Sequence, residues 1–497
     1  MNTVRDTCVQ QLRAAMPEAM IWAEEDGGPA SLLEYAHAMP GGWAALQDGQ
    51  DFVDLAVTEA TRLFSPAAGI ALRRQWEERF LALTANHLGV DLHPEFLQGN
   101  MVMALGCAHA VPLLACGGVP CNNMAFPRGL LLPPKSADTT LPRRLPLLPV
   151  GDRHAFVSAQ KPLTAGHIRS ALDSLIHADL KQDERPLAKT ILAEIFGHAM
   201  VLAQASFRDQ MCVANALFWQ RLTKPELHLP PLVCLDLQHL CRHLISFDLR
   251  HSGSLVHDIL LESELTDAIL YHLDGTRACW SLDSCGSPVR GSFLFWALDE
   301  KGRSLSLGLE KDSRGNRFLV APRCPKLRFP LQAQALQQAL HEERLLPTLY
   351  LSFVATGMAR GLACAGGIFQ YAYLPTMTAK TAEALHVCRQ PASAERLRAV
   401  CPLGTGFHAL QVQASHAGPD AAFHTAGGWD ILRCGGLSES VWADFGAVDP
   451  REAFRASWAF QYEDIIPRAE RHHGWLAALR QPAPCLLPQE PLQLTRN

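Results

Sequence analysis

The sequence predicts an α/β fold, with a mixed α+β arrangement as the alternative. The prediction depends on two short apolar runs, residues 80–85 and 111–115, which each end in polar or glycine-rich residues. Between them, residues 95–109 are mostly small or apolar and have the composition of a buried helix. Two buried strands joined by a helix form a βαβ unit, which is nearly always right-handed. We expect this unit near residues 79–116.

The first 78 residues are predicted to be helical. Residues 50–59 have apolar positions at helical spacing, and this pattern ends before Pro66. Ser65 followed by Pro66 is typical of a helix start, because serine caps the first turn and proline fits within it. No glycine or proline separates this helix from the run that starts at residue 80. If the helix instead continues to Ala85, the βαβ prediction fails.

A proline-rich excursion follows the βαβ unit and is predicted to cover the site as a lid. Five prolines between residues 133 and 149 exclude a regular helix. The leucines of the same stretch indicate that it packs against the protein. Residues 163–222 are then predicted to be helical. A strand over residues 232–237 is expected to precede a helix over residues 238–245.

The middle third of the chain has a pattern that predicts a β-hairpin. Two β-rich runs flank the turn signal at residues 299–302, and a further strand is expected over residues 316–321. A long apolar helix is predicted over residues 345–361, followed by a glycine-interrupted strand end at residues 363–370. Residues 372–480 are predicted to be mostly helical or irregular.

The length of the chain suggests two to three domains or one large one. We divide its 497 residues into three parts. Residues 1–150 hold the helices, the βαβ unit and the lid, and residues 151–330 hold a helical segment, a strand and the hairpin. Residues 331–497 are helix-rich, and all three parts can also form one domain.

Composition and charge exclude several classes of protein. The net charge is −5 and no basic tract occurs, so a nucleic-acid partner is not expected. Residues 101–120 lack charged side chains, but Pro112 and two glycines interrupt them, so no membrane span is expected. The fifteen cysteines are scattered and the first twenty residues lack the apolar core of a signal peptide. These features favour a cytoplasmic protein with reduced thiols.

Polar residues after the first predicted strand indicate a metal site. His87, Asp91 and His93 are spaced so that one loop can present all three, and imidazole and carboxylate groups bind zinc, iron and manganese. The sequence therefore predicts a divalent metal, zinc or iron, with His87 also catalytic and with Asn86 and Asn123 orienting the ligands. The alternative is that these side chains cap the loop, form a turn and start the next helix.

A second hypothesis places a cysteine nucleophile after the second strand. Cys121, or Cys116, can form a reactive thiolate if backbone amides and Arg128 lower its pKa, with His87 or His109 as its base. Asn122 is then expected to contact the substrate. The alternative is that both thiols are small buried core groups.

The third candidate region is the glycine-rich strand end near residue 366. Gln370 and Tyr373 follow it and are predicted to bind substrate, because glycines permit close approach and both side chains form hydrogen bonds. Residues 404–409 resemble a dinucleotide loop, but Pro402 lies just before them and the sequence predicts no convincing strand there, so no nucleotide cofactor is expected. No phosphate loop, nucleophile elbow or HExxH motif occurs.

These observations support three functional hypotheses. The first is a cytoplasmic enzyme that acts on a small polar molecule by metal-assisted hydrolysis or group transfer. The second is a metal-free, cysteine-dependent transferase. The third is a non-catalytic protein that binds a small molecule or serves as a scaffold.

Overall fold

The computed structural model describes most of the chain. The described residues are 2–24, 28–41, 49–84, 86–134, 139–181, 184–284, 286–397, 403–413, 423–481 and 485–488. The structure is 51% helix and 17% strand, with one five-stranded parallel sheet and several small antiparallel sheets. This composition and the parallel sheet confirm the predicted α/β class.

The largest sheet has five parallel strands in the order β15-β14-β1-β2-β5. Leu83 of β1 pairs with Ala365 of β14 on one side and with Leu113 of β2 on the other. All three predicted parts of the chain contribute strands to this sheet. Its strands are β1 (Leu81–Leu83), β2 (Val111–Ala115), β5 (Leu232–Asp236), β14 (Ala363–Gly366) and β15 (Leu403–Gly404).

The predicted βαβ unit is present. Helix α6 (Pro94–Leu105) connects β1 to β2 and packs against both strands. Every residue of β1 and β2 is buried, which explains why their sequences are continuous apolar runs. Residues 95–104 of α6 are buried as well, so this helix is enclosed by other elements.

The region before β1 is helical, as predicted, and its described residues form five helices. Ser65 caps α5 by accepting a hydrogen bond from the backbone N–H of Ala68, and Pro66 is in the first turn. Because α5 ends at Glu78, strand β1 can form; Ala85 lies outside the described residues. The helices are α1 (Asn2–Ala15), α2 (Pro17–Glu24), α3 (Leu32–Ala38), α4 (Gln50–Leu63) and α5 (Pro66–Glu78).

The proline-rich excursion contains an antiparallel hairpin that the sequence did not predict. It consists of β3 (Gly129–Leu132) and β4 (Arg143–Pro146), and residues 135–138 between them lie outside the described residues. The prolines exclude a helix but still permit edge strands, which explains the difference.

The segment between the hairpin and β5 is mainly helical, as predicted. It comprises η1 (Val150–His154), η2 (Val157–Ala159), α7 (Ala165–Ser174), α8 (Glu184–Ile191), η3 (Leu192–Phe196), α9 (Ala199–Leu202) and α10 (Phe207–Gln220). After β5 come α11 (Leu237–Asp248), α12 (Leu255–Leu261) and α13 (Ser263–His272). None of the helices in the described part of the chain combines the length and apolar character that a membrane span requires.

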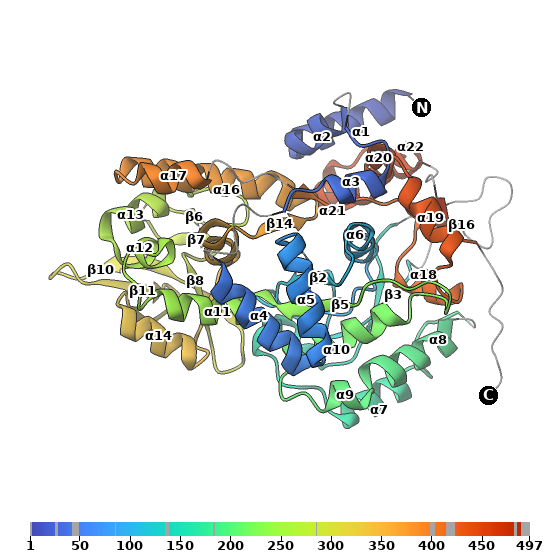
Figure 1. Ribbon diagram of the computed structural model, residues 1–497, viewed down its shortest axis with the longest axis horizontal. Coiled ribbons are helices and arrows are strands. Elements are labelled where there is room, and N and C mark those ends of the chain that lie inside the picture. Colours follow the sequence, from blue (N-terminus) through green and yellow to red (C-terminus); the bar gives the residue numbers. More distant parts are fainter. Residues whose placement is uncertain are drawn as a thin grey trace.

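The middle of the chain is rich in short antiparallel strands. The predicted hairpin is formed by β8 and β9, and β11 matches the predicted strand at residues 316–321. The strands are β6 (Ser281–Leu282), β7 (Pro288–Arg290), β8 (Phe295–Leu298), β9 (Ser304–Ser306), β10 (Gly308–Lys311), β11 (Arg317–Ala321), β12 (Cys324–Pro330) and β13 (Leu345–Pro347). Figure 1 shows β6, β7, β8, β10 and β11 beside α12, α13 and α14 (Ala333–His341).

The predicted helix over residues 345–361 is partly wrong. Its first three residues form β13, which pairs with β8. Pro347 ends this strand, and the helical part then follows as α15 (Leu349–Phe353) and the π-helix η4 (Val354–Met358). The long-range pairing with β8 overrides the local apolar pattern, which cannot distinguish a buried strand from a buried helix.

The C-terminal third is mostly helical and meets the N-terminal helices. Its elements are α16 (Ile368–Val387), α17 (Pro391–Leu397), β16 (Leu410–Gln413), β17 (Phe423–Thr425), α18 (Gly428–Arg433), α19 (Glu439–Ala447), α20 (Pro450–Ala456), α21 (Trp458–Ile465), η5 (Arg468–Glu470), α22 (Trp475–Leu479) and β18 (Cys485–Leu486). Helix α1 packs against α21 and α22, and α2 packs against α20, as Figure 1 shows.

Candidate functional site

The order of the strands reverses between β1 and β14. The chain passes from β1 to β2 and β5 on one side, and later adds β14 and β15 on the other side of β1. In open parallel sheets, such a reversal leaves a crevice at the carboxyl ends of the two strands, where ligands bind. The carboxyl ends of β1 and β14 are therefore the place where a ligand site is expected.

A cavity of about 200 Å³ lies at this edge of the sheet, and we name it the His87 cavity. Residues that follow β1 and β2, residues from the β-rich middle of the chain and a residue of α16 line it. They are Thr84, His87, Cys116, Gly118, Val119, Ala278, Cys279, Ser292, Trp296, Thr348, Leu349 and Tyr373. No Asp, Glu, Lys or Arg is present among these described residues, so the cavity suits an uncharged polar ligand.

His87 is held at the end of β1 by an extension of the sheet. Its backbone forms a parallel bridge with Cys116, and its ring packs against Phe96 with 5.5 Å between the ring centroids. Burial lowers the pKa of His87 to about 4, although the Asn123 side chain favours the protonated form. The imidazole is therefore neutral at pH 7. Its Nδ1 is buried and has no hydrogen-bond partner among the described residues.

Helix α16 brings Gln370 and Tyr373 to the same edge of the sheet. Gln370 donates from Nε2 to Thr84 Oγ1 at 2.7 Å and to the Cys364 carbonyl at 3.2 Å. Its Oε1 is buried and has no hydrogen-bond partner within the described part of the chain. Tyr373 lines the His87 cavity, and burial raises the pKa of its phenol well above the ordinary value. The phenol is therefore available as a hydrogen-bond donor. The structure thus brings together three residues that the sequence singled out: His87, Gln370 and Tyr373.

Asn86 and Asp91 belong to a buried network that holds the loop after β1. Asp91 Oδ2 accepts hydrogen bonds from the side-chain amides of Asn86 at 3.0 Å, Asn100 at 2.6 Å and Asn215 at 3.0 Å. Burial raises the pKa of Asp91 to about 6, and the three amides oppose this rise. Neither Asn86 nor Asp91 lines the His87 cavity, so this network positions the loop.

The predicted convergence of His87, Asp91 and His93 is not found. In the described part of the chain, three possible ligand atoms lie within 4.8 Å of one another only at His257, Asp258 and Glu262 of α12 and its end. That group is partly exposed, and exposed acidic clusters are common without a metal. Amides surround Asp91 Oδ2, and the two imidazoles line different cavities. A metal site at this loop stays a prediction, but the described residues lack the close approach of three ligand atoms on which that prediction was based.

His93 lines a second cavity, of about 70 Å³. The ring of Phe96 contacts both imidazoles, with centroids 5.5 Å from His87 and 5.3 Å from His93. The proline-rich excursion lines this second cavity and not the His87 cavity, so its role as a lid stays a prediction. It contributes Leu131, Leu132, Pro133, Pro134, Thr139, Thr140 and Pro142 to the wall.

The thiols of Cys116 and Cys121 are unsuited to nucleophilic attack. Burial raises the pKa of each to about 12. A hydrogen bond of 3.2 Å from Gln238 Nε2 to Cys116 Sγ and the charge of Arg128 near Cys121 do not overcome the burial. Both thiols are therefore protonated at pH 7, as buried core thiols are. The thirteen cysteines in the described residues are all unpaired.

Asn122, Asn123 and Arg128 lie on the loop between β2 and β3. Asn123 shapes the loop, because its Nδ2 donates to the Pro120 carbonyl at 2.6 Å and its Oδ1 accepts from the Ala125 N–H at 2.8 Å. Asn122 is exposed. Arg128 is only 5% exposed and has no hydrogen-bond or ion-pair partner for its guanidinium among the described residues.

The turn after β2 depends on Gln238, which the sequence did not single out. Gln238 Oε1 accepts hydrogen bonds from the N–H groups of Gly117 at 2.7 Å and Gly118 at 3.0 Å. A Cβ at position 117 would lie 2.2 Å from Ser158 Oγ, so only glycine fits there. The glycine pair was the one signal in the sequence for this close approach.

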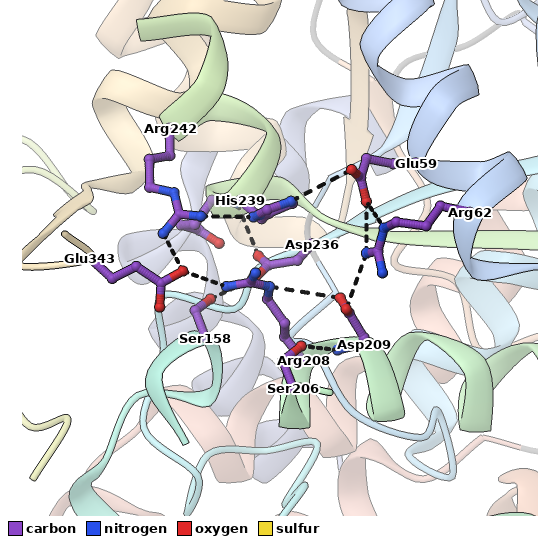
Figure 2. Close-up of polar contacts among 11 residues, drawn as sticks. Glu59, Arg62, Ser158, Ser206, Arg208, Asp209, Asp236, His239, Arg242 and Glu343 are labelled. Carbon is purple, nitrogen blue, oxygen red and sulfur yellow. Dashed lines mark hydrogen bonds and ion pairs between the residues drawn. The ribbon is translucent and has the colours of Figure 1, made fainter. Parts of the chain in front are cut away.

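A network of charged side chains lies beyond the carboxyl end of β5 (Figure 2). Its main members are Glu59, Arg62, Ser158, Arg208, Asp209, Asp236, His239, Arg242 and Glu343. Glu343 pairs with Arg208 at 3.3 Å and with Arg242 at 2.5 Å. Arg62 pairs with Glu59 at 2.8 Å and with Asp209 at 3.1 Å. Because each arginine has a carboxylate partner, the network joins α4, α10 and α11 rather than forming an open binding site.

No relative offers a role that can be carried over to this site. No protein-family model matches the chain, and neither a curated protein nor a solved structure matches it. The His87 cavity, at the reversal of the strand order, is therefore the basis for the proposed function.

Buried histidines are expected to make the protein less stable in acid. Burial lowers the pKa of both His93 and His408 to about 3. Below about pH 6.5 the unfolded chain binds protons that the folded state excludes, so the free energy of unfolding falls as the pH falls. Replacing His408 with phenylalanine should reduce this slope by about 1.4 kcal/mol per pH unit between pH 6 and 5. Urea titrations of both proteins at several pH values measure the slope.

Replacing Glu95 with glutamine is the matched control, because it should change the pH dependence of the free energy of unfolding in the opposite direction. Burial raises the pKa of Glu95 to about 7, and the charge of Asp464 adds to the rise. The folded state therefore binds this proton first, and Glu95 stabilises the fold as the pH falls from 7. The Glu95→Gln variant should lose stability more steeply in acid than the unmodified protein. Parallel curves for all three proteins would contradict the assignment of buried, neutral imidazoles.

Proposed function

We propose that the protein is an enzyme that binds a small, uncharged polar molecule in the His87 cavity and acts on it by hydrolysis or group transfer. The observation that carries the proposal is the neutral imidazole of His87, with its buried, unpartnered Nδ1, on the wall of this cavity. A buried nitrogen without a partner costs free energy unless a ligand supplies the missing hydrogen bond.

The roles follow from the protonation states of the side chains. His87 Nδ1 accepts a hydrogen bond from a hydroxyl or from water and takes its proton as that oxygen attacks the carbonyl carbon of an ester or amide ligand. The bond from this carbon to the leaving alcohol or amine then breaks, and the imidazolium returns the proton to the leaving group. The Tyr373 phenol donates a hydrogen bond to an oxygen of the ligand, because burial keeps it protonated. Gln370 does not line the cavity itself, and its role is to hold Thr84, which does, through the hydrogen bond from its Nε2.

The mechanism proposed here needs neither a metal nor a thiolate. The predicted metal ligands do not converge, and burial holds the pKa of both candidate thiols near 12. Non-catalytic binding of a small molecule is the second candidate function, and the uncharged lining of the cavity supports it equally. A cytoplasmic location stays part of the proposal, supported by the unpaired cysteines of the described residues.

The test is ligand binding to the full chain and to a His87→Leu variant. A panel of small uncharged alcohols, polyols and amides is screened by saturation-transfer NMR, and the dissociation constants of the hits are measured. Loss of one buried hydrogen bond, of about 1–3 kcal/mol, should weaken binding of the hits roughly five- to hundredfold in His87→Leu.

The control is His109→Leu, which changes a half-buried histidine paired with Glu78 at 2.8 Å outside the cavity. This variant should bind the hits as the unmodified protein does. Equal affinity of His87→Leu for every hit would overturn the proposal. Binding without turnover of any hit in the presence of water would favour the non-catalytic alternative.

A further inference from the structure

We infer that Arg128 and Arg144 form a binding site for an oxyanion, the carboxylate or phosphate group of a ligand. The exposed fraction of Arg128 is 5%, and its buried Nε has no hydrogen-bond partner among the described residues. No carboxylate among the described residues pairs with it. An isolated charge is costly to bury unless a group of opposite charge compensates it.

A second guanidinium lies close to the first. Both face the ring of Phe126, with the Arg128 Cζ 5.4 Å and the Arg144 Cζ 5.0 Å from its centroid. Arg144 has one weak hydrogen bond, of 3.4 Å to the Asn122 carbonyl, and no carboxylate partner among the described residues. Two like charges that share one aromatic ring repel each other, so an anion between them would relieve both the burial and the repulsion.

Several other arginines of the structure have carboxylate partners. Arg143, the neighbour of Arg144 on β4, pairs with Glu184 at 2.6 Å. Arg360 pairs with two aspartates, and the arginines of Figure 2 all have carboxylate partners. Arg128 and Arg144 differ from these, because the fold brings the two together and no carboxylate of the described residues pairs with either.

The loop that contains Arg128 has an unusual backbone conformation two residues before this arginine. Phe126 has a φ of 44°, which is rare for a bulky residue, and it is buried. Strained backbone of this kind occurs where the surrounding structure holds a functional side chain in place. The planar guanidinium presents its donors as a fork that matches the oxygens of carboxylate and phosphate.

The anion site lies beside the two cavities. Arg144 is close enough to His93 for its charge to act on that imidazole, and Asn123, on the Arg128 loop, interacts with His87. The anion site and the two cavities are therefore linked through His93 and Asn123, although neither arginine lines a cavity. The anion site consists of residues other than those of the proposed function, so each proposal can be tested without the other.

The experiment measures anion binding by the full chain. Sodium phosphate, sodium acetate and sodium chloride are titrated at equal ionic strength, and the melting temperature is followed. Phosphate or acetate should raise the melting temperature more than chloride does, and the stronger of the two identifies the ligand group. Arg128→Met and Arg144→Met should each weaken binding of that anion at least tenfold. Arg303→Met, which removes an arginine with 53% side-chain exposure, is the control and should bind normally.

A second readout separates a binding role from a structural one. Without added anion, Arg128→Met should melt at the same temperature as the unmodified protein or higher, because the variant removes an uncompensated buried charge. If Arg128→Met does not fold, Arg144→Met carries the binding test, since Arg144 is exposed. Unchanged anion affinity in the folded variants would overturn the inference, as would equal effects of all three salts.

Discussion

Replacing Arg360 with alanine is expected to destabilise the protein by about 3–5 kcal/mol. The Arg360 side chain is 5% exposed and pairs with Asp51 of α4 at 2.6 Å and with Asp248 of α11 at 2.9 Å. A further hydrogen bond of 2.8 Å joins its Nη1 to the Ala355 carbonyl of η4. Removing the guanidinium leaves two carboxylates without their cation, and Asp248 is itself buried. Chemical denaturation followed by far-UV circular dichroism measures the loss.

The control for this prediction is Arg303→Ala. Arg303 pairs with Asp299 at 2.7 Å, but its side chain is 53% exposed, so the loss should be no more than about 1 kcal/mol. The double variant Arg360→Ala with Asp248→Asn should be more stable than Arg360→Ala alone, because it removes one of the two carboxylate charges that have lost their cation. A loss below about 1 kcal/mol for Arg360→Ala would mean that the ion pairs contribute little.

Replacing Asp91 with alanine should cost at least about 3 kcal/mol of the free energy of unfolding. Three buried amides, of Asn86, Asn100 and Asn215, donate to the same carboxylate oxygen and would each lose a charged acceptor. Because Asn86 precedes His87 directly, the variant should also weaken binding in the His87 cavity. Chemical denaturation and the NMR binding assay measure the two effects.

Asp91→Asn is the matched variant for this prediction. It keeps the shape of the side chain and a carbonyl acceptor, so its loss should be clearly smaller than that of Asp91→Ala. Burial raises the pKa of Asp91 to about 6, so near pH 5 the native side chain is itself mostly protonated. Only the folded, unmodified protein takes up this proton, so the stability loss of Asp91→Asn relative to the unmodified protein should widen between pH 7 and pH 5. Equal losses for both variants at pH 7 would show that the three amides do not depend on Asp91.

Much of the fold could be predicted because its signals are local. The capped start at Ser65 and Pro66 and the turn at residues 299–302 are each encoded within a few residues. The apolar runs of β1 and β2 are buried on both faces, which a sequence shows as an uninterrupted run. The error at residues 345–347 arose because a buried strand and a buried helix have the same apolar pattern.

The candidate site was predicted in part. His87, Gln370 and Tyr373 were chosen as polar residues that follow apolar runs, and the structure brings them to one edge of the sheet. Asp91 was assigned to a metal because carboxylates bind metals, but its partners, Asn100 and Asn215, are not visible as partners in the sequence. Hydrogen bonds between side chains far apart in the chain depend on how the elements pack.

The sequence by itself determined the class of the fold, the βαβ unit and the polar edge where a ligand is expected, because these depend on the residues of one short segment. Only the tertiary structure decided that β14 lies beside β1, some 280 residues away in the chain, and so where the strand order reverses. It also decided that Arg360 has two acidic partners and that Arg128 has none among the described residues. The sequence specifies the charge of an arginine. Whether a carboxylate compensates that charge depends on which acidic residues the packed elements bring within about 4 Å.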